Sequence, residues 1–177
     1  MRYKRRLFIS AVLTVVMIGV MQYQGVLLKT PQTPMGILDL EFAGTVENAT
    51  RLYNTWLPVL AIALNNVLID FLFIICYTLL LHTALLLIRK RGDSLWRRFG
   101  NWMVRGVIIA GFFDVVENIL MLRTLNGHIS KEVVASTFMF AAIKFLLIVL
   151  AIAYILLTPL VMRKKRVQSN TLLNDLQ

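Results

Sequence analysis

The chain has 177 residues, of which 58% are hydrophobic, and its mean hydropathy is +0.73. The apolar residues occur in long runs, which excludes an ordinary soluble domain and indicates an integral membrane protein. The net charge of +10 comes from basic residues at the edges of these runs. It therefore indicates membrane topology and not nucleic-acid binding. With one cysteine, Cys76, the chain forms no internal disulfide and has no cysteine spacing typical of a metal site.

The first predicted helix covers residues 5–27 and follows a basic start that includes Arg2, Lys4, Arg5 and Arg6. A basic start followed by a short apolar run also describes a secretory signal peptide. Because no small-x-small cleavage motif follows the run, we interpret it as a retained signal anchor, with cleavage as the alternative. Its charged end is expected to stay in the cytoplasm.

Residues 28–55 are predicted to form an extracytoplasmic segment, since two prolines and a glycine exclude a continuous helix. Residues 38–42 alternate between apolar and acidic, which predicts a short strand or an extended segment on the membrane face. This segment is either a surface connector or a lid over a cavity, which Asp39 and Glu41 would make negative. Thr45 has the sequence context of an N-cap, so a helix is expected to begin there.

The second predicted membrane helix covers residues 56–88 and is roughly 50 Å long, which exceeds the hydrocarbon thickness of about 30 Å. We therefore expect its first turns to stand partly outside the bilayer. Asp70 is its only formally charged residue, and Asn66 lies four residues earlier on the same helix face. His82 lies deeper and is interpreted as a packing residue, because a single histidine is weak evidence for metal binding.

Residues 89–105 combine basic and aromatic side chains, which predicts an amphipathic connector at the anionic headgroups of the cytoplasmic face. The third predicted helix covers 102–123 and the fourth covers 133–162, with a turn at Asn126-Gly127 between them. Residues 163–177 begin with four basic residues and are expected to form a cytoplasmic tail with a disordered end.

The distribution of basic residues predicts four membrane helices with both termini in the cytoplasm. In that arrangement, 14 of the 19 Lys and Arg residues lie on the cytoplasmic side and four lie on the outer side. The remaining one, Lys144, lies within the fourth helix. This asymmetry follows the positive-inside rule. The expected fold is an all-α bundle in the cytoplasmic membrane.

Ionisable residues within the predicted membrane helices form the candidate site. Asp114, Glu117 and Asn118 are spaced i, i+3 and i+4, so they share one helical face. Intramembrane charges are costly without partners and therefore indicate function. Three acids and one base cannot all be charged and neutralised, so at least one carboxyl is expected to be protonated. The candidate ligand-binding residues, expected in one layer of the outer half of the membrane, are Asp70, Asp114, Glu117, Asn118, Lys144 and Asn66.

The sequence lacks the motifs of several common catalytic, metal and phosphate-binding sites. It contains no Gly-rich phosphate loop, no histidine pair at metal-ligand spacing and no serine with an evident histidine and acid partner. Two carboxylates on one helix are a weak signal for a divalent cation. We therefore expect no catalytic residues, no cofactor and no metal, and an enzyme is the less favoured interpretation.

Three functional hypotheses follow. The first is an interaction or scaffold protein whose polar layer locks the helices, beside a second copy of the chain or another membrane protein. The second is binding of a lipid or small amphiphile in an outer-leaflet cavity, where Lys144 meets an anionic headgroup and Asp114 or Glu117 meets a polar one. The third is transfer of protons or cations, which ranks last because few polar residues continue toward the cytoplasm.

Overall fold

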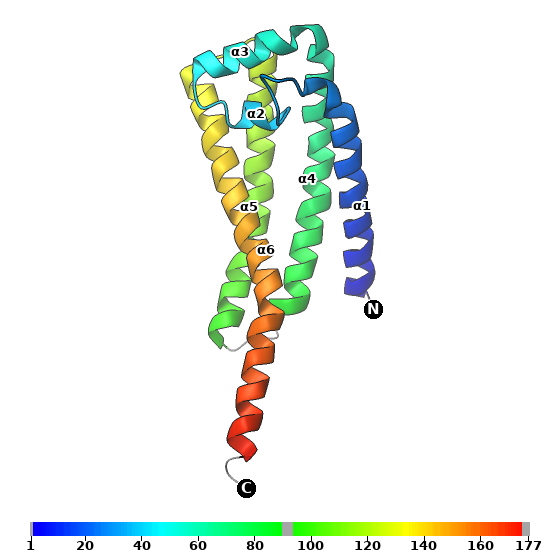
Figure 1. The fold of residues 1–177 in the computed structure, drawn as a ribbon, viewed down its shortest axis with the longest axis vertical. Helices are drawn as coiled ribbons and strands as arrows, with labels where there is room; N and C mark the ends of the chain where they lie inside the picture. The colour runs from blue at the N-terminus through cyan, green and yellow to red at the C-terminus, as the bar shows by residue number, and fades with distance from the viewer. Residues whose placement is uncertain (1, 90–93, 175–177) are drawn as a thin grey trace.

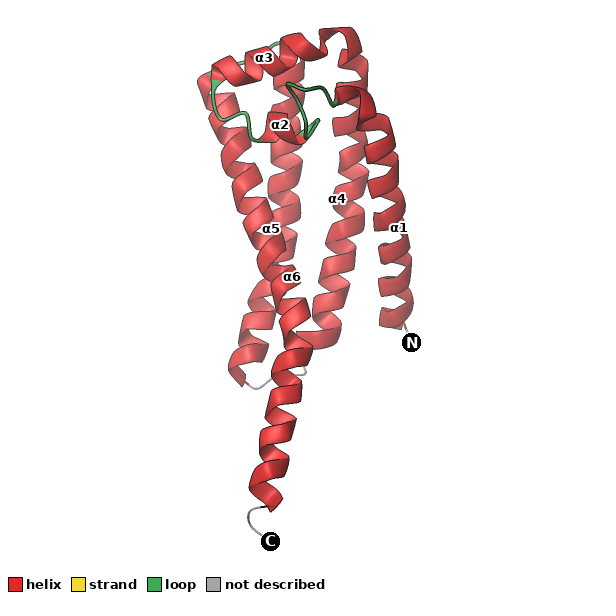
Figure 2. Ribbon diagram, viewed as in Figure 1, coloured by secondary structure: helices red, strands yellow, loops and turns green. Residues whose placement is uncertain are grey.

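The computed structural model describes residues 2–89 and 94–174, with side chains described for 3–89 and 94–162. The protein is 88% helical, and no strand occurs within these ranges. Four long helices run side by side and two short ones cover one end of the bundle (Figures 1 and 2). The long helices are α1 (Arg2–Gln24), α4 (Leu60–Ile88), α5 (Ser94–Leu125) and α6 (Lys131–Asn174).

Three stretches of the described chain are long and apolar enough to cross a membrane, namely Tyr3–Leu28, Val46–Ile88 and Lys131–Met162. Helix α5 is also long, but acidic residues in its middle and arginines toward its ends interrupt its apolar sequence. Length and composition therefore establish three candidate spans, and they do not by themselves mark α5 as a fourth. It packs along both α4 and α6, whereas α1 packs against α4.

Residues 28–55, predicted to be extracytoplasmic and called the outer segment for that reason, contain two helices. These helices, α2 (Leu38–Glu41) and α3 (Val46–Trp56), lie across one end of the bundle (Figure 1). As predicted, Thr45 caps α3, and its hydroxyl oxygen accepts a hydrogen bond from the Asn48 amide at 3.2 Å. A short 3₁₀ turn, η2 (Leu57–Val59), contains Pro58 and separates α3 from α4. The predicted single helix over 56–88 therefore begins as a regular α-helix only at Leu60.

The prediction of a strand or extended segment at residues 38–42 is wrong. Residues 38–41 form one helical turn, in which the Phe42 amide donates to the Leu38 carbonyl. Positive-φ glycines, Gly36 at 65° and Gly44 at 70°, reverse the chain on both sides of this turn. A strand would place Asp39 and Glu41 on the same side, whereas a helix turns them apart. Asp39 therefore accepts the Met35 amide, while Glu41 is buried.

Two hydrogen bonds attach the start of this segment to the rest of the bundle. Helix α1 passes into the 3₁₀ helix η1 (Gly25–Leu28), and the Leu28 carbonyl accepts the Trp56 indole N–H at 3.0 Å. The Thr33 hydroxyl donates to the same carbonyl at 2.6 Å. Leu28, Thr33 and Trp56 are all fully buried. The outer segment is therefore packed as part of the core.

The two later helices also extend beyond their predicted ranges. Helix α5 begins at Ser94, so part of the expected connector is continuous with it, while 90–93 lie outside the described residues. Helix α6 continues past Pro159 to Asn174, although we expected it to end near residue 162. The missing proline N–H is tolerated there, and no further proline or glycine follows in the helix. The turn predicted at Asn126-Gly127 is confirmed, with Gly127 at φ 83°.

Candidate functional site: a buried polar layer beside a lateral cavity

The buried side chains form two hydrophobic clusters, and all the candidate polar residues except Asn66 lie between them along the helices. The outer cluster, next to α3, includes Val67, Met121 and Val134. The inner cluster includes Ile74 and Val107 and, on α6, Ala151. Asp70, Asp114 to Asn118 and Lys144 each fall between these positions. The helices thus bring their polar residues to one level.

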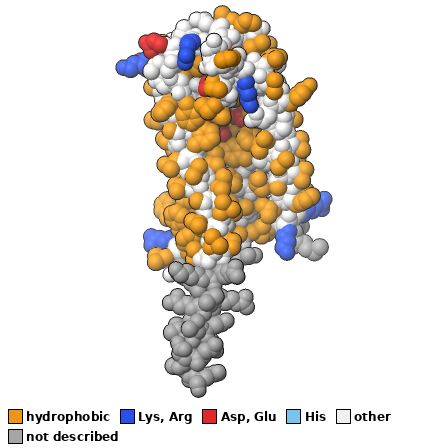
Figure 3. Space-filling view, viewed as in Figure 1, with side chains coloured by type: hydrophobic (Ala, Val, Ile, Leu, Met, Phe, Trp, Pro, Cys, Tyr) orange, Lys and Arg blue, Asp and Glu red, His pale blue; other side chains and the backbone are white. Residues whose placement is uncertain are grey.

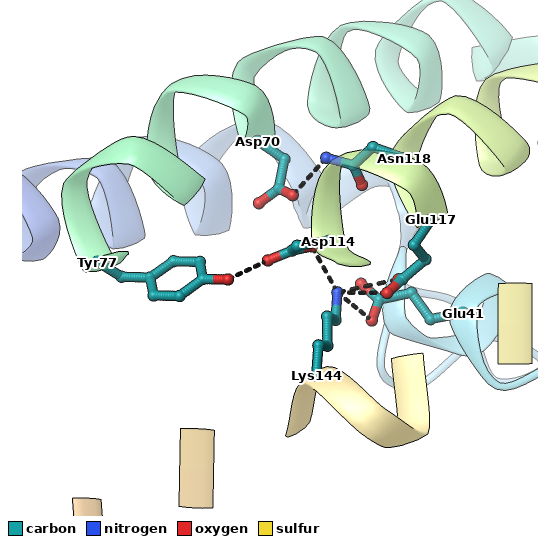
Figure 4. A network of polar contacts seen from close by, with 7 residues as sticks. All are labelled: Glu41, Asp70, Tyr77, Asp114, Glu117, Asn118 and Lys144. Carbon is teal, nitrogen blue, oxygen red and sulfur yellow. Dashed lines mark hydrogen bonds and ion pairs between the residues drawn. The ribbon is translucent and has the colours of Figure 1, made fainter. Parts of the chain in front are cut away.

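Lys144 is the centre of this layer (Figure 4). Its ammonium nitrogen donates to Asp114 Oδ1 at 2.8 Å, and both carboxylate oxygens of Glu117 lie 2.9 Å from it. A third carboxylate, Glu41 Oε2, lies 3.1 Å from the same nitrogen. Lys144, Asp114 and Glu117 are 4%, 3% and 0% exposed. A single buried ammonium group therefore lies within ion-pair distance of three carboxyl groups.

Two further hydrogen bonds extend the layer to α4. The Tyr77 hydroxyl donates to Asp114 Oδ2 at 2.7 Å, and the Asn118 amide donates to Asp70 Oδ2 at 2.7 Å. Asp70 is partly buried and faces the same region. The structure thus brings together five of the six candidate residues, Asp70, Asp114, Glu117, Asn118 and Lys144.

Asn66 lies apart from this network. Its amide donates to the Met21 carbonyl of α1 at 3.2 Å, so it joins α4 to α1. A Cβ at Gly25 would come within 3.3 Å of the Asn66 amide nitrogen, which shows how closely η1, directly after α1, approaches α4. Asn66 nevertheless lines the same cavity as Asp70 and Asp114.

Glu41 is the charged member that the candidate set lacked. We had considered it only as a surface acid on a possible lid, because nothing in the alternation around it distinguishes a buried acid from an exposed one. Burial raises the pKa of the Glu41 carboxyl above its ordinary value, because desolvation outweighs the attraction of Lys144. Tyr77 was also missing from the set, since a tyrosine in an apolar helix is usually a packing residue.

A cavity of about 420 Å³ lies beside the polar layer, in the range typical of small-molecule sites. Its walls come mainly from α1, α4 and α6 and are mostly apolar. Helix α5 contributes Asp114 and Met121, and α2 borders one end. Figure 3 shows a largely apolar face with Lys and Arg near its two ends and acidic atoms visible in a hollow. The polar side chains lining the cavity include Glu41, Asn66, Asp70, Tyr77, Asp114 and Lys144.

The chain matches no protein-family model, no characterised protein and no solved structure. The site is therefore interpreted from its own geometry. Within the described part of the chain, no group of three or more His, Cys, Asp or Glu side chains has an arrangement suited to a metal ion. The carboxylates of the layer converge instead on an ammonium group.

Proposed function

We propose that this protein is a multi-pass protein of the cytoplasmic (inner) membrane that binds a lipid or another amphiphile in its lateral cavity. The observation that carries the proposal is that one cavity combines mostly apolar walls with ionisable side chains of the polar layer, namely Glu41, Asp70, Asp114 and Lys144. Apolar walls suit a hydrocarbon chain, and a few convergent polar groups suit a head group. The side of the cavity that α1 and α6 line would lie within the bilayer if these helices span it.

The proposal includes four spanning helices, with α5 as the third. In its favour, the polar residues in the middle of α5, Asp114, Glu117 and Asn118, are all buried inside the bundle. The outward surface of the same stretch is apolar, with Ile108, Phe112 and Ile119 exposed. A helix with this distribution suits a lipid environment on its outer face. The excess of basic residues in the first, middle and last segments supports cytoplasmic termini.

The direct test is to count bound amphiphiles in a variant whose cavity is filled. Ile18 lies on α1, lines the cavity and is 46% exposed, so Ile18→Trp adds bulk at the wall with little effect on the core. Native mass spectrometry of protein released from detergent is expected to show lipid bound to the wild type and less bound to Ile18→Trp.

The matched control is Val16→Trp, on the same helix and 53% exposed, which does not line the cavity. This variant should retain lipid like the wild type. Equal lipid occupancy in both tryptophan variants and the wild type, or none in any of them, would refute the proposed function.

A second candidate is a scaffold or interaction protein, favoured by the fact that the polar layer joins α2, α4, α5 and α6. Such a layer can lock helix packing without any ligand. A wild type that carries no amphiphile but loses its fold when the layer is altered would favour this function. Proton transfer has less support, because the hydrogen bonds from Lys144 and Asp114 toward the inner cluster extend among the described residues only to Tyr77.

A further inference from the structure

Carboxyl groups outnumber cations in the polar layer. Those of Glu41, Asp114 and Glu117 surround the single Lys144 ammonium, and Asp70 adds a fourth. Three of these four acids, Glu41, Asp70 and Asp114, also line the cavity. Asp70 accepts one hydrogen bond, from Asn118, and no cation lies within ion-pair distance of it among the described residues. Beside the cavity, the polar layer therefore offers more carboxyl groups than Lys144 can pair with.

We propose that the cavity selects amphiphiles with a cationic, ammonium-bearing head group, which Asp70 and Asp114 receive while the hydrocarbon chain lies along α1 and α6. This inference rests on the proposed function, since it specifies the ligand of the same cavity. An ammonium head group would donate to the carboxyl oxygens of Asp70 and Asp114 and would favour their ionised forms.

A second feature of the cavity points the same way. Glu41 is 6% exposed and lines the cavity, and its Oε2 lies 3.1 Å from the Lys144 ammonium. A carboxylate oxygen has two lone pairs, so it can accept a second hydrogen bond. A bound ammonium group would supply one from the cavity side.

The aromatic wall also favours a cation. The rings of Phe73 and Tyr77 both line the cavity, with centroids 5.3 Å apart. Phe145 lines it from α6 and already lies 5.0 Å from the Lys144 ammonium. Aromatic faces attract ammonium groups in sites with little water.

An anionic head group, which we had expected Lys144 to meet, fits this geometry poorly. Lys144 already contacts three carboxylates, so a phosphate approaching it would also approach them. The other cation that lines the cavity is Lys29, whose side chain is exposed and donates to Gln22 at 2.8 Å. A phosphate is therefore expected to bind more weakly than an ammonium.

The test compares three probes that share one chain, namely dodecylamine, dodecanol and dodecyl phosphate. Each is titrated at neutral pH into the delipidated full-length protein in a nonionic detergent with a bulky head, and occupancy is read by native mass spectrometry. We expect dodecylamine to bind at least tenfold more tightly than either other probe. Binding of all three with equal affinity, or tighter binding of dodecyl phosphate, would overturn the inference while leaving an amphiphile site. Binding of none of them would overturn the proposed function as well.

Asp70→Asn provides the site-specific arm of the test. This variant removes the charge and keeps the shape, and it should bind dodecylamine at least tenfold more weakly while its affinity for dodecanol is unchanged. Asp39→Asn is the matched control, because Asp39 is an acid of the outer segment that does not line the cavity. An Asp70→Asn variant with wild-type affinity for dodecylamine would contradict the inference. The comparison of probes on the wild type decides the question even if this variant does not fold.

Discussion

At the scale of single residues, Lys144 has the largest electrostatic role in the described structure. A buried ion pair recovers its desolvation cost only when geometry and hydrogen bonding are good, and removing one partner leaves an uncompensated charge. Here one ammonium serves three carboxylates, so its removal leaves several acids without a cation. The loss of any one acid leaves two others on Lys144. The two kinds of substitution should therefore differ strongly.

We expect Lys144→Met to lower the free energy of unfolding by about 3 kcal/mol or more. Glu117→Gln should cost less, because Lys144 keeps Glu41 and Asp114. The double variant should recover part of the loss, since it carries one buried acid fewer than Lys144→Met alone. Thermal unfolding in detergent measures all four forms of the cycle.

The control for this cycle is Lys131→Met, which changes an exposed lysine at the start of the same helix. It should leave the unfolding temperature close to that of the wild type. A Lys144→Met protein as stable as the wild type would show that the acids are already neutralised without Lys144.

A pH dependence follows from Glu41, which faces Lys144, Glu117, Asp114 and Asp70. Its pKa is raised by burial, so the folded chain holds this proton at pH values where the unfolded chain has released it. Stability from this group is therefore greatest at low pH and falls as pH rises from about 4.5, its ordinary value, to the raised pKa. The slope is at most about 1.4 kcal/mol per pH unit.

Glu41→Gln removes this contribution. Its unfolding temperature should fall less than that of the wild type between pH 5 and pH 8, measured in the same detergent. Glu47→Gln, which changes an exposed acid of α3, should retain the wild-type slope. Identical pH profiles for the Glu41 variant and the wild type would disprove the assignment.

At the scale of helices, two glycines of α5 differ in how closely a neighbour approaches them. A Cβ built at Gly111 would lie 2.7 Å from the Thr78 hydroxyl of α4, which is too close for an unchanged structure. A Cβ built at Gly106 would lie 3.6 Å from Leu147 of α6, an ordinary contact. Threonine is stiff about χ1, so Thr78 moves aside only at a cost. Gly111 therefore sets the distance between α4 and α5.

Gly111→Ala is expected to lower the free energy of unfolding by about 1 to 3 kcal/mol through overpacking. Gly106→Ala on the same helix is the matched control and should leave stability unchanged or raise it, since alanine favours helix. Thermal unfolding of both variants distinguishes packing from helix propensity. Equal effects at the two positions would argue against a close α4–α5 contact.

How much of this arrangement could be predicted depends on the range of the interactions involved. The apolar runs and the Thr45 cap are local signals, and they predicted helices where the structure has them. The helical turn at α2 was missed because it depends on the glycine turns around it and on a salt bridge with a residue far along the chain. Glu41 and Lys144 are brought together only by packing, and no spacing in the sequence encodes that contact.

At the scale of the whole molecule, the proposal of four spans predicts which residues face each side of the membrane. In a Cys76→Ser background, Asn126→Cys should react with a membrane-impermeant maleimide added to intact cells. Lys4→Cys should react only after the cells are permeabilised. Both positions are exposed, so a lack of reaction reports the membrane and not burial. Labelling of Lys4→Cys in intact cells would contradict cytoplasmic termini.

The convergence of three acids on Lys144 also has a consequence for how the chain is made. Asp114 and Glu117 precede Lys144 by 30 and 27 residues, so a ribosome completes them before their cation exists. If α5 spans the bilayer as proposed, then α5 alone would have to enter with its acids protonated or unpaired. The tight turn at Asn126-Gly127 lets α6 fold back on it at once. In that case the α5–α6 hairpin is the smallest unit that can leave the translocon with Lys144 paired to Asp114 and Glu117, so α5 would enter the bilayer together with α6.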